Sequence, residues 1–486
     1  MSKTHVSDLP DITSSDDSTR LTGITQGSTG TKSNVNIPLR DLAVPRTGDA
    51  SYRKLSSWAS DIRRQAVLRN TPLDVITDPI ALTLTKGTGL SAASITAGGT
   101  GYVVGDNLTL ADGTADFPAV IRVVAVDNNG AVTSAAVQKA GCYSTTPANP
   151  VAITGGTGTG FAANASWNAG IASSIYNPKQ VSRIESVFKY TGYDVRDAVS
   201  GYRGNGVQNG TQCIIEFMSD AALLEFRLVG NNYSGDLYID DHRVSLESIH
   251  TDTTGAPHLY VVDHQGVSKV RRYRLCGFNT GFGGINTSQN ATLWYPPELN
   301  KPFAWVMGDS YTVGIGASQS SFNDVRVMLD TLGMEGIADG ISGSGWSSTQ
   351  DGRVPAWRVE NKLGMLNRTP QFVILNLGYN DNAITDLTRV SEPFNAAVEK
   401  IKELVPLAQI LCIGPATPLG RVAVITKIRE VVMERCAAHG IPFIDVDDWV
   451  NAANKSAYTL SDAVHPTNAG HMYRGIRLAH AIAEII

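Results

Sequence analysis

Residues 303–312, FAWVMGDSYT, run from an apolar stretch into Gly308, Asp309 and Ser310. Further apolar runs, with helical patterns between them, follow at 335–340, 372–378, 408–414 and 442–448. Strands that are apolar on both sides and alternate with helices are typical of a parallel sheet covered on both faces. We therefore predict a flavodoxin-like α/β domain over 301–486, in which ligands bind beyond the carboxyl ends of the strands.

The residues before this domain have a different pattern. From 171 to 300, apolar and polar residues alternate in short runs, which predicts an antiparallel, jelly-roll-like β-sandwich. Residues 81–170 are rich in glycine and poor in charge, and predict a small all-β module. The prolines in WYPPELNKP (294–302) predict a stiff linker, because they exclude helix and ladder pairing. Residues 1–80 are polar, with one amphipathic helix expected at 54–70.

Composition excludes several classes of protein. The 486 residues carry 40 Lys and Arg against 45 Asp and Glu, so nothing draws the whole chain to nucleic acid. No apolar run has the length of a secretory signal or a membrane span, and we expect a soluble chain without membrane insertion. The five cysteines are far apart in sequence and form no C-x-x-C pair. We expect them to be buried thiols made in a reducing cytoplasm.

Ser310 is the candidate nucleophile, because it lies where a buried strand turns toward a helix. A serine hydroxyl is a weak nucleophile at neutral pH and requires a base that is oriented by a third group. The segment Asp462-Ala-Val-His465-Pro466 provides both groups. His465 can take the proton and return it, and Asp462 can hold the imidazole tautomer. Pro466 keeps His465 on the loop before the last helix.

Acyl transfer also requires donors at the point where the carbonyl oxygen becomes negative. We expect three: the backbone N–H of Ser310, a backbone N–H of the turn 340–346 (GISGSGW), and the side-chain amide of Asn380. Within the turn, Gly343 is the first choice and Gly345 the alternative, since a residue without Cβ allows the closest approach.

These blocks resemble the SGNH (GDSL-like) hydrolase family over about residues 302–486. The resemblance rests on Gly308-Asp309-Ser310, on Gly343, on Gly378-x-Asn380-Asp381 and on Asp462-x-x-His465. It implies a serine esterase with Ser310, His465 and Asp462 as the triad and with Gly343 and Asn380 as oxyanion donors. Tyr311 stands where the commonest form of the motif has leucine, a difference expected to leave catalysis untouched.

No cofactor or metal is expected, because no His or carboxylate cluster has ligand spacing. We expect Asp309 and Asp381 to brace the two catalytic loops by hydrogen bonds. His439, His471 and His480 are assigned structural roles.

The front half of the chain resembles a bacteriophage tail fibre or tailspike in composition. That resemblance implies attachment to the phage tail or baseplate through the N-terminus, a homotrimer, a location on the virion tail, and O-acetylated bacterial capsule or O-antigen polysaccharide as substrate. The main prediction is thus a polysaccharide O-deacetylase. The alternatives are a bacterial carbohydrate acetyl esterase without virion role and a non-catalytic adhesin.

Two other enzyme classes are less favoured. A glycan-cleaving depolymerase would show a long repeat or a carboxylate pair, and a lipase would show an apolar lid segment. In the sandwich, Tyr190, Tyr193 and Tyr202 are interpreted as core residues rather than as surfaces for sugars. Substrate specificity is expected in the loops 346–358 and 415–421.

Overall fold

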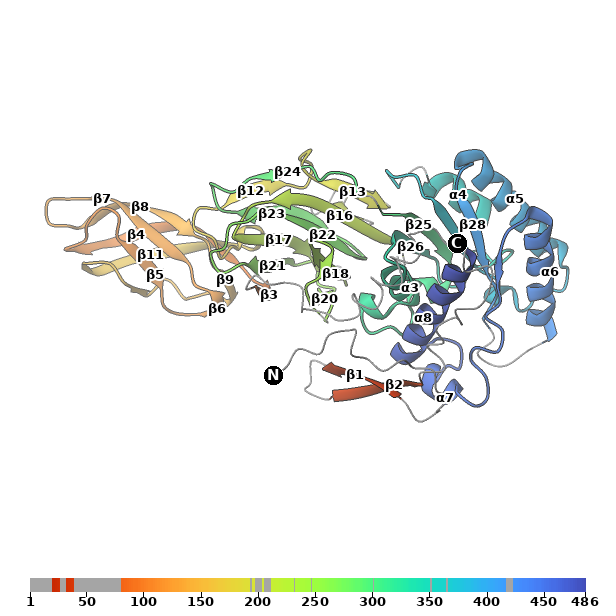
Figure 1. Ribbon diagram of the computed structural model, residues 1–486. Coiled ribbons are helices and arrows are strands. Elements are labelled where there is room, and N and C mark those ends of the chain that lie inside the picture. Colours follow the sequence, from red (N-terminus) through yellow and green to blue (C-terminus); the bar gives the residue numbers. More distant parts are fainter. Residues whose placement is uncertain are drawn as a thin grey trace, which may run out of the picture.

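The computed structural model describes residues 80–192, 211–230, 232–245, 247–299, 301–349, 352–363, 366–416 and 423–486, and the backbone of strands at 20–26, 32–38, 195–196 and 203–204. The helix predicted at 54–70 lies outside these residues. The strands near the N-terminus are β1 (Arg20–Gln26) and β2 (Lys32–Pro38), which pair antiparallel. The remaining elements form three units in a row, with an all-β module at one end and the α/β domain at the other (Figure 1).

The Gly-rich module is all-β, as predicted. A long pair, β4 (Gly89–Thr100) and β11 (Thr159–Asn168), packs beside a four-stranded sheet, and β6 (Thr114–Phe117) pairs with β9 (Cys142–Thr145). The four-stranded sheet consists, in spatial order, of β10 (Ile153–Thr154), β5 (Asn107–Leu110), β7 (Val120–Val126) and β8 (Val132–Lys139). Their core includes Leu90, Tyr102 and Phe161.

The middle unit is the predicted antiparallel sandwich. Its first sheet has the path β14 (Val195–Arg196), β15 (Arg203–Gly204), β23 (Phe282–Thr287), β17 (Leu223–Val229), β21 (Pro257–Asp263) and β3 (Ala81–Lys86), and β12 (Lys179–Ser182) also pairs with β23. Its second sheet has the path β13 (Lys189–Gly192), β16 (Gln212–Ser219), β22 (Arg271–Phe278), β18 (Ser234–Ile239) and β19 (His242–Arg243), joined by β20 (Ile249–His250) and β24 (Leu293–Trp294).

Two sequence boundaries differ from the observed pairing. Strand β3 lies in the range predicted for the Gly-rich module, yet it pairs with β21 of the sandwich, from His258↔Lys86 to Asp263↔Ala81. The predicted linker at 294–302 begins inside β24, which pairs with β16. Its Glu298 also forms an ion pair with Lys189 at 2.7 Å. The start of this segment is therefore bonded to the sandwich.

The C-terminal unit is the predicted parallel sheet. Its strands lie in the order β26 (Glu335–Gly340), β25 (Phe303–Gly308), β27 (Phe372–Asn376), β28 (Gln409–Ile413) and β29 (Phe443–Ile444), and all neighbours are parallel. The first strand in sequence is thus second in space, with the second strand on one side and the third on the other. This is the flavodoxin-like order, and its crevice opens at the carboxyl ends of β25 and β27.

Alternate residues of the strands face opposite helix layers. Trp305 and Met307 pack on the layer of α4 (Pro355–Leu363), α5 (Thr388–Leu404) and α6 (Ala423–His439). Ala304 and Val306 pack on α3 (Asp324–Leu332) and α8 (Asn468–Ile485). Shorter helical turns are α2 (Ser310–Val313), α7 (Lys455–Tyr458), Ala169–Ile171, Ser320–Phe322 and Tyr379–Asp381. In the described part of the chain, none of the helices combines the length and apolar character needed to traverse a bilayer.

The sandwich and the α/β domain share a buried interface. Three residues of the sandwich strands pack into the hydrophobic cluster of the parallel sheet and not into the sandwich core: Ile214, Tyr238 and Cys276. Polar links run beside them: Arg274 pairs with Glu335 at 3.1 Å. The two units are therefore held against each other by both apolar packing and a buried ion pair.

Candidate active site

The nucleophile position is built by the end of β25. Gly308 closes the strand, and a Cβ there would lie 1.8 Å from the Thr312 hydroxyl oxygen, so only glycine allows this turn. Asp309 caps the short helix α2 by accepting a hydrogen bond from the Tyr311 N–H at 3.0 Å. Ser310 is the first residue of α2 and stands at the carboxyl edge of the sheet.

His465 and Asp462 complete a relay with this serine. The distance from His465 Nε2 to Ser310 Oγ is 2.9 Å, and the distance from His465 Nδ1 to Asp462 Oδ2 is 2.6 Å. Asp462 also accepts the N–H groups of Val464 and His465, each at 2.9 Å. The hydrogen bond from His465 and these N–H groups lower the pKa of Asp462 to about 2. A carboxylate on Nδ1 leaves Nε2 free to accept the serine proton.

The expected oxyanion donors lie on three adjoining segments. Within the described residues, neither the Ser310 N–H nor the Gly343 N–H has a hydrogen-bond partner, and Gly343 adopts a φ of 76°. The Gly345 N–H instead donates to Ser348 O at 2.7 Å. A Cβ on Gly345 would lie 2.4 Å from the carboxylate of Asp381, so this glycine serves the packing of the turn. The geometry favours Gly343 over Gly345 as donor.

Asn380 is placed beside both other segments. Its amide nitrogen donates to Ser344 O at 2.9 Å and lies 3.4 Å from Asp309 Oδ2. To stabilise an oxyanion as well, the amide would exchange the longer contact with Asp309 for the substrate oxygen. Asp309 is 3% exposed, and burial raises the pKa of its carboxyl to about 6.

The carboxylate of Asp381 binds the backbone that follows the glycine turn. Its two carboxylate oxygens accept the N–H groups of Trp346, Ser347 and Ser348 at 2.7, 2.9 and 2.9 Å. The expected bracing role of Asp381 thus has a concrete form, since one buried side chain accepts three N–H groups from the 346–348 segment.

Arg358 is a residue that sequence reasoning missed. The residue is 1% exposed, and its guanidinium donates to Gly308 O at 3.0 Å and to Ser344 Oγ at 3.3 Å. It therefore ties the end of β25 to the glycine turn. Arg358 lies in the stretch 346–358, for which the sequence predicts only a role in substrate specificity. The available signal was its position in an apolar helical pattern, one residue before Val359.

A buried charge cluster supports Arg358. Asp339 of β26 pairs with Lys362 at 2.6 Å and lies 3.5 Å from Arg358. Thr211 of the sandwich donates to the same carboxylate at 2.9 Å. Burial by itself would raise the pKa of Asp339, but the charges on Lys362 and Arg358 bring the pKa below its ordinary value. The cluster links the sandwich to the base of the catalytic edge.

The other histidines, tyrosines and cysteines singled out in the sequence have, where the structure describes them, the contacts or the burial expected of structural residues. His439 contacts Asn395 Oδ1 at 2.9 Å, and His471 contacts Ile315 O at 3.0 Å. Tyr190 is buried in the sandwich core, whereas Tyr193 and Tyr202 lie outside the described residues. All five cysteines lie in the described part of the chain, where they are buried and form no disulfide. In the regions that the structure covers, no three His, Cys, Asp or Glu side chains form a group that could hold a metal ion.

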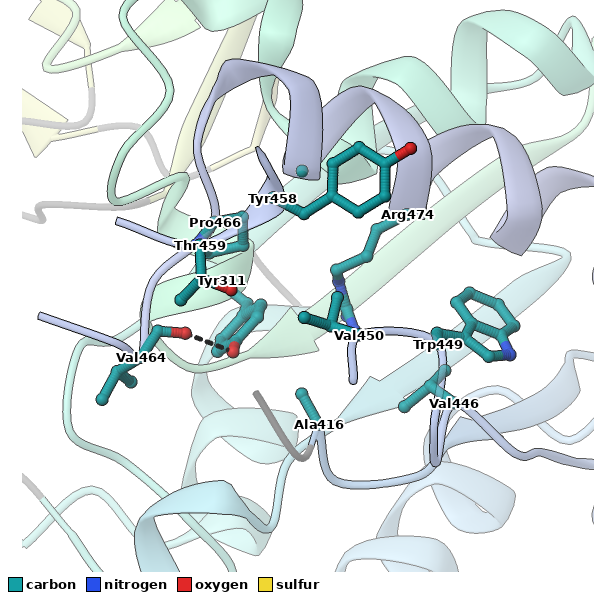
Figure 2. Close-up of a pocket in the computed structure, with 11 residues that line it drawn as sticks. Tyr311, Ala416, Val446, Trp449, Val450, Tyr458, Thr459, Val464, Pro466 and Arg474 are labelled. Atoms are coloured by element: carbon teal, nitrogen blue, oxygen red, sulfur yellow. Dashed lines mark hydrogen bonds between the residues drawn. The ribbon is translucent and has the colours of Figure 1, made fainter. Parts of the chain in front are cut away.

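Figure 2 shows a small cavity behind the histidine loop, with Tyr311, Val450 and Arg474 among its walls. Its volume of about 20 Å³ suits roughly one water molecule. A second, open pocket near Pro302 and Phe372 lies at the amino ends of the strands, opposite the catalytic edge. Neither is the site of the chemistry, which is set by the Ser310–His465 contact.

Residues 306–473 match the GDSL-like lipase/acylhydrolase family. No curated protein matches the chain. Similar solved structures include a family two carbohydrate esterase from Clostridium thermocellum in complex with cellohexaose, which is 16% identical over 60% of this chain and 97% of that chain, with a TM-score of 0.48. They also include an acetyl xylan esterase from the rumen bacterium Butyrivibrio proteoclasticus (16%, 62%, 96%, TM-score 0.45) and a salicylyl-acyltransferase from a tetracycline biosynthetic pathway (16%, 63%, 95%, TM-score 0.44).

Proposed function

We propose that this chain, whose C-terminal domain is a serine hydrolase of the GDSL-like (SGNH) type, removes O-acetyl groups from a polysaccharide through an acyl-Ser310 intermediate. The ester-hydrolase class follows from the family match over 306–473. The observation that carries the mechanism is the continuous hydrogen-bonded path from Asp462 through His465 to Ser310, at 2.6 and 2.9 Å.

The reaction uses each member of this path in turn. The Ser310 hydroxyl gives its proton to His465 Nε2 as its oxygen attacks the ester carbonyl. The N–H groups of Ser310 and Gly343 then stabilise the negative oxygen of the tetrahedral intermediate. His465 returns the proton to the leaving sugar hydroxyl, and Asp462 stabilises the imidazolium meanwhile. A water molecule, activated by the same imidazole, releases acetate from Ser310.

The shape of the site supports a substrate of this kind. The side chains of His465 and Asp462 are 23% and 45% exposed, so the relay lies open at the molecular surface. An acetyl ester that projects from a bulky polymer can reach such a relay without burial of the polymer itself. Polysaccharide and acetyl group are therefore the substrate classes that we propose.

The virion role is a separate hypothesis. Attachment to a phage tail, a homotrimer and a location on the virion were expected from residues 1–80 and from composition, and neither the described residues nor the comparisons bear on them. We favour the carbohydrate esterase without virion role, because the family match and the catalytic arrangement require no attachment to a virion. A monomer measured by light scattering on the full chain would agree with this choice, whereas a stable trimer would favour the tail protein.

The test of the function uses two substrates and one variant. The protein is expected to hydrolyse p-nitrophenyl acetate and to release acetate from acetylated polysaccharides, followed by NMR, and Ser310→Ala should lose both activities by at least a factor of about 10³. Equal rates in variant and parent would remove Ser310 from the mechanism. Hydrolysis of the small ester without any release from polysaccharides would overturn the substrate class, and binding without hydrolysis would favour the adhesin.

A further inference from the structure

Tyr311 makes a second bridge between the nucleophile and the histidine loop. Its hydroxyl donates a hydrogen bond of 2.6 Å to the carbonyl oxygen of Val464, as Figure 2 shows. Tyr311 follows Ser310 in sequence, and Val464 precedes His465. Two hydrogen bonds thus run side by side between the same two segments, one from residue 310 to 465 and one from residue 311 to 464.

The loop 460–465, which carries the histidine, makes few other hydrogen bonds to distant segments. Its remaining hydrogen bonds are local, such as Leu460 N–H to His465 O at 2.7 Å and Ala463 N–H to Leu460 O at 2.9 Å. Among the residues that the structure describes, the bonds from Ser310 and Tyr311 are those that connect 460–465 to distant segments. Ala463 also has a φ of 58°, a conformation that costs energy for alanine. The loop therefore depends on outside contacts for its position.

Tyr311 itself is firmly held. The residue is 3% exposed, and the guanidinium carbon of Arg474 lies 4.8 Å from the centre of its ring. Arg474 in turn donates to Asp324 of α3 at 2.9 Å. Burial raises the pKa of the Tyr311 phenol well above its ordinary value, so its hydroxyl is a permanent donor at any assay pH. The bridge thus reaches from α3 and α8 to the backbone beside His465.

We propose that Tyr311 is a positioning residue that holds His465 at attack distance from Ser310. This inference rests on the proposed function, and it differs from the expectation that a residue other than leucine at this position leaves catalysis untouched. When the Val464 carbonyl loses its donor, the loop samples positions in which the imidazole is out of reach of the serine. The reactivity of Ser310 then falls. Substrate binding should change little, because Tyr311 is only 3% exposed.

The test compares Tyr311→Phe with Tyr473→Phe. Tyr473 is a matched control, because it is also 3% exposed and its hydroxyl also donates to a backbone carbonyl, that of Trp449, at 3.1 Å. The measured quantity is the rate at which a fluorophosphonate labels Ser310. In this reaction, the serine oxygen displaces fluoride and His465 takes the proton. The final extent of labelling reports the fraction of protein that is not irreversibly inactive. Urea unfolding of each variant checks that the protein is fully folded under the labelling conditions, so that the rate is not lowered by partial unfolding.

We expect Tyr311→Phe to lower the labelling rate and kcat together by about tenfold, with KM within about twofold of the parent. Since the phenol does not ionise, the same ratio of rates is expected at pH 6 and pH 9. Tyr473→Phe should label within about twofold of the parent rate. Tyr311→Leu, which also removes the hydroxyl, should label at least as slowly as Tyr311→Phe.

Three outcomes are distinguishable. Parent-like labelling rates in both Tyr311 variants would overturn the positioning role and leave the esterase intact. A fall in Tyr473→Phe equal to that in Tyr311→Phe would also overturn it, because the effect would then be one of general stability. If the parent protein is not labelled at Ser310 at all, the proposed function fails first.

Discussion

Asp309 shows how a single residue beside the nucleophile couples folding to pH. Burial raises the pKa of its carboxyl to about 6, whereas in the unfolded chain the value is about 3.9. The folded protein therefore binds this proton more tightly than the unfolded chain does. The resulting stabilisation is complete below about pH 4 and is lost as the pH rises through about 6. This difference between the folded and unfolded pKa values corresponds to about 3 kcal/mol in the free energy of unfolding.

Replacement of Asp309 by asparagine should remove this pH dependence. We expect the free energy of unfolding of Asp309→Asn, relative to the parent, to increase by about 2 to 3 kcal/mol between pH 4 and pH 7. Urea unfolding at several pH values measures the difference. The exposed Asp386→Asn is the control, because hydrogen bonds from Thr388 keep the pKa of Asp386 below this interval. If the difference in the free energy of unfolding between Asp309→Asn and the parent is the same at every pH, the assignment of a raised pKa to Asp309 is contradicted.

At the scale of elements, the strands were predictable and the support of the turn was not. The run FAWVMG predicts a strand with two apolar faces, and β25 has Trp305 toward one helix layer and Val306 toward the other. The four motif blocks also placed Ser310 and His465 at one edge, because the carboxyl ends of parallel strands meet there. The role of Arg358 could not be predicted from the sequence, because its partner atoms Gly308 O and Ser344 Oγ become neighbours only in the folded chain.

The 346–348 segment depends on Asp381. Asp381→Ala should lower the free energy of unfolding by about 2 to 4 kcal/mol, because one buried and two partly buried N–H groups lose their acceptor. Asp381→Asn should cost about half as much, since its carbonyl oxygen can still accept from Ser347 and Ser348. Thermal and urea unfolding of both variants provide the comparison. Equal stability of Asp381→Ala and the parent would mean that other contacts hold the turn.

At the scale of the whole molecule, the sandwich and the catalytic domain meet through buried charge. Glu335 is 2% exposed and pairs with Arg274 of the sandwich at 3.1 Å and with Arg368. The sequence predicted both units but not this interface. A period of two in β16 places alternate residues on two faces, yet it does not say that Ile214 on the outer face will be covered by the parallel sheet.

Removal of the Glu335 charge tests this interface. Glu335→Gln leaves the buried Arg274 and the partly buried Arg368 without their carboxylate, and we expect a loss of about 3 kcal/mol in the free energy of unfolding. Glu403→Gln is the matched control, because Glu403 is 63% exposed and its pair with Lys400 lies on the surface. Its effect should stay within about 0.5 kcal/mol. Similar small effects of both variants would show that the two units are held by apolar packing alone.

The central claim is that an acyl group passes through the oxygen of Ser310. The most direct measurement is rapid acid quench of the protein during hydrolysis of p-nitrophenyl acetate, followed by mass spectrometry of its peptides. The account predicts one added acetyl group on the peptide that contains Ser310, with none on that peptide in Ser310→Ala. Steady hydrolysis with the acetyl group found on a different side chain, and undiminished in Ser310→Ala, would contradict it.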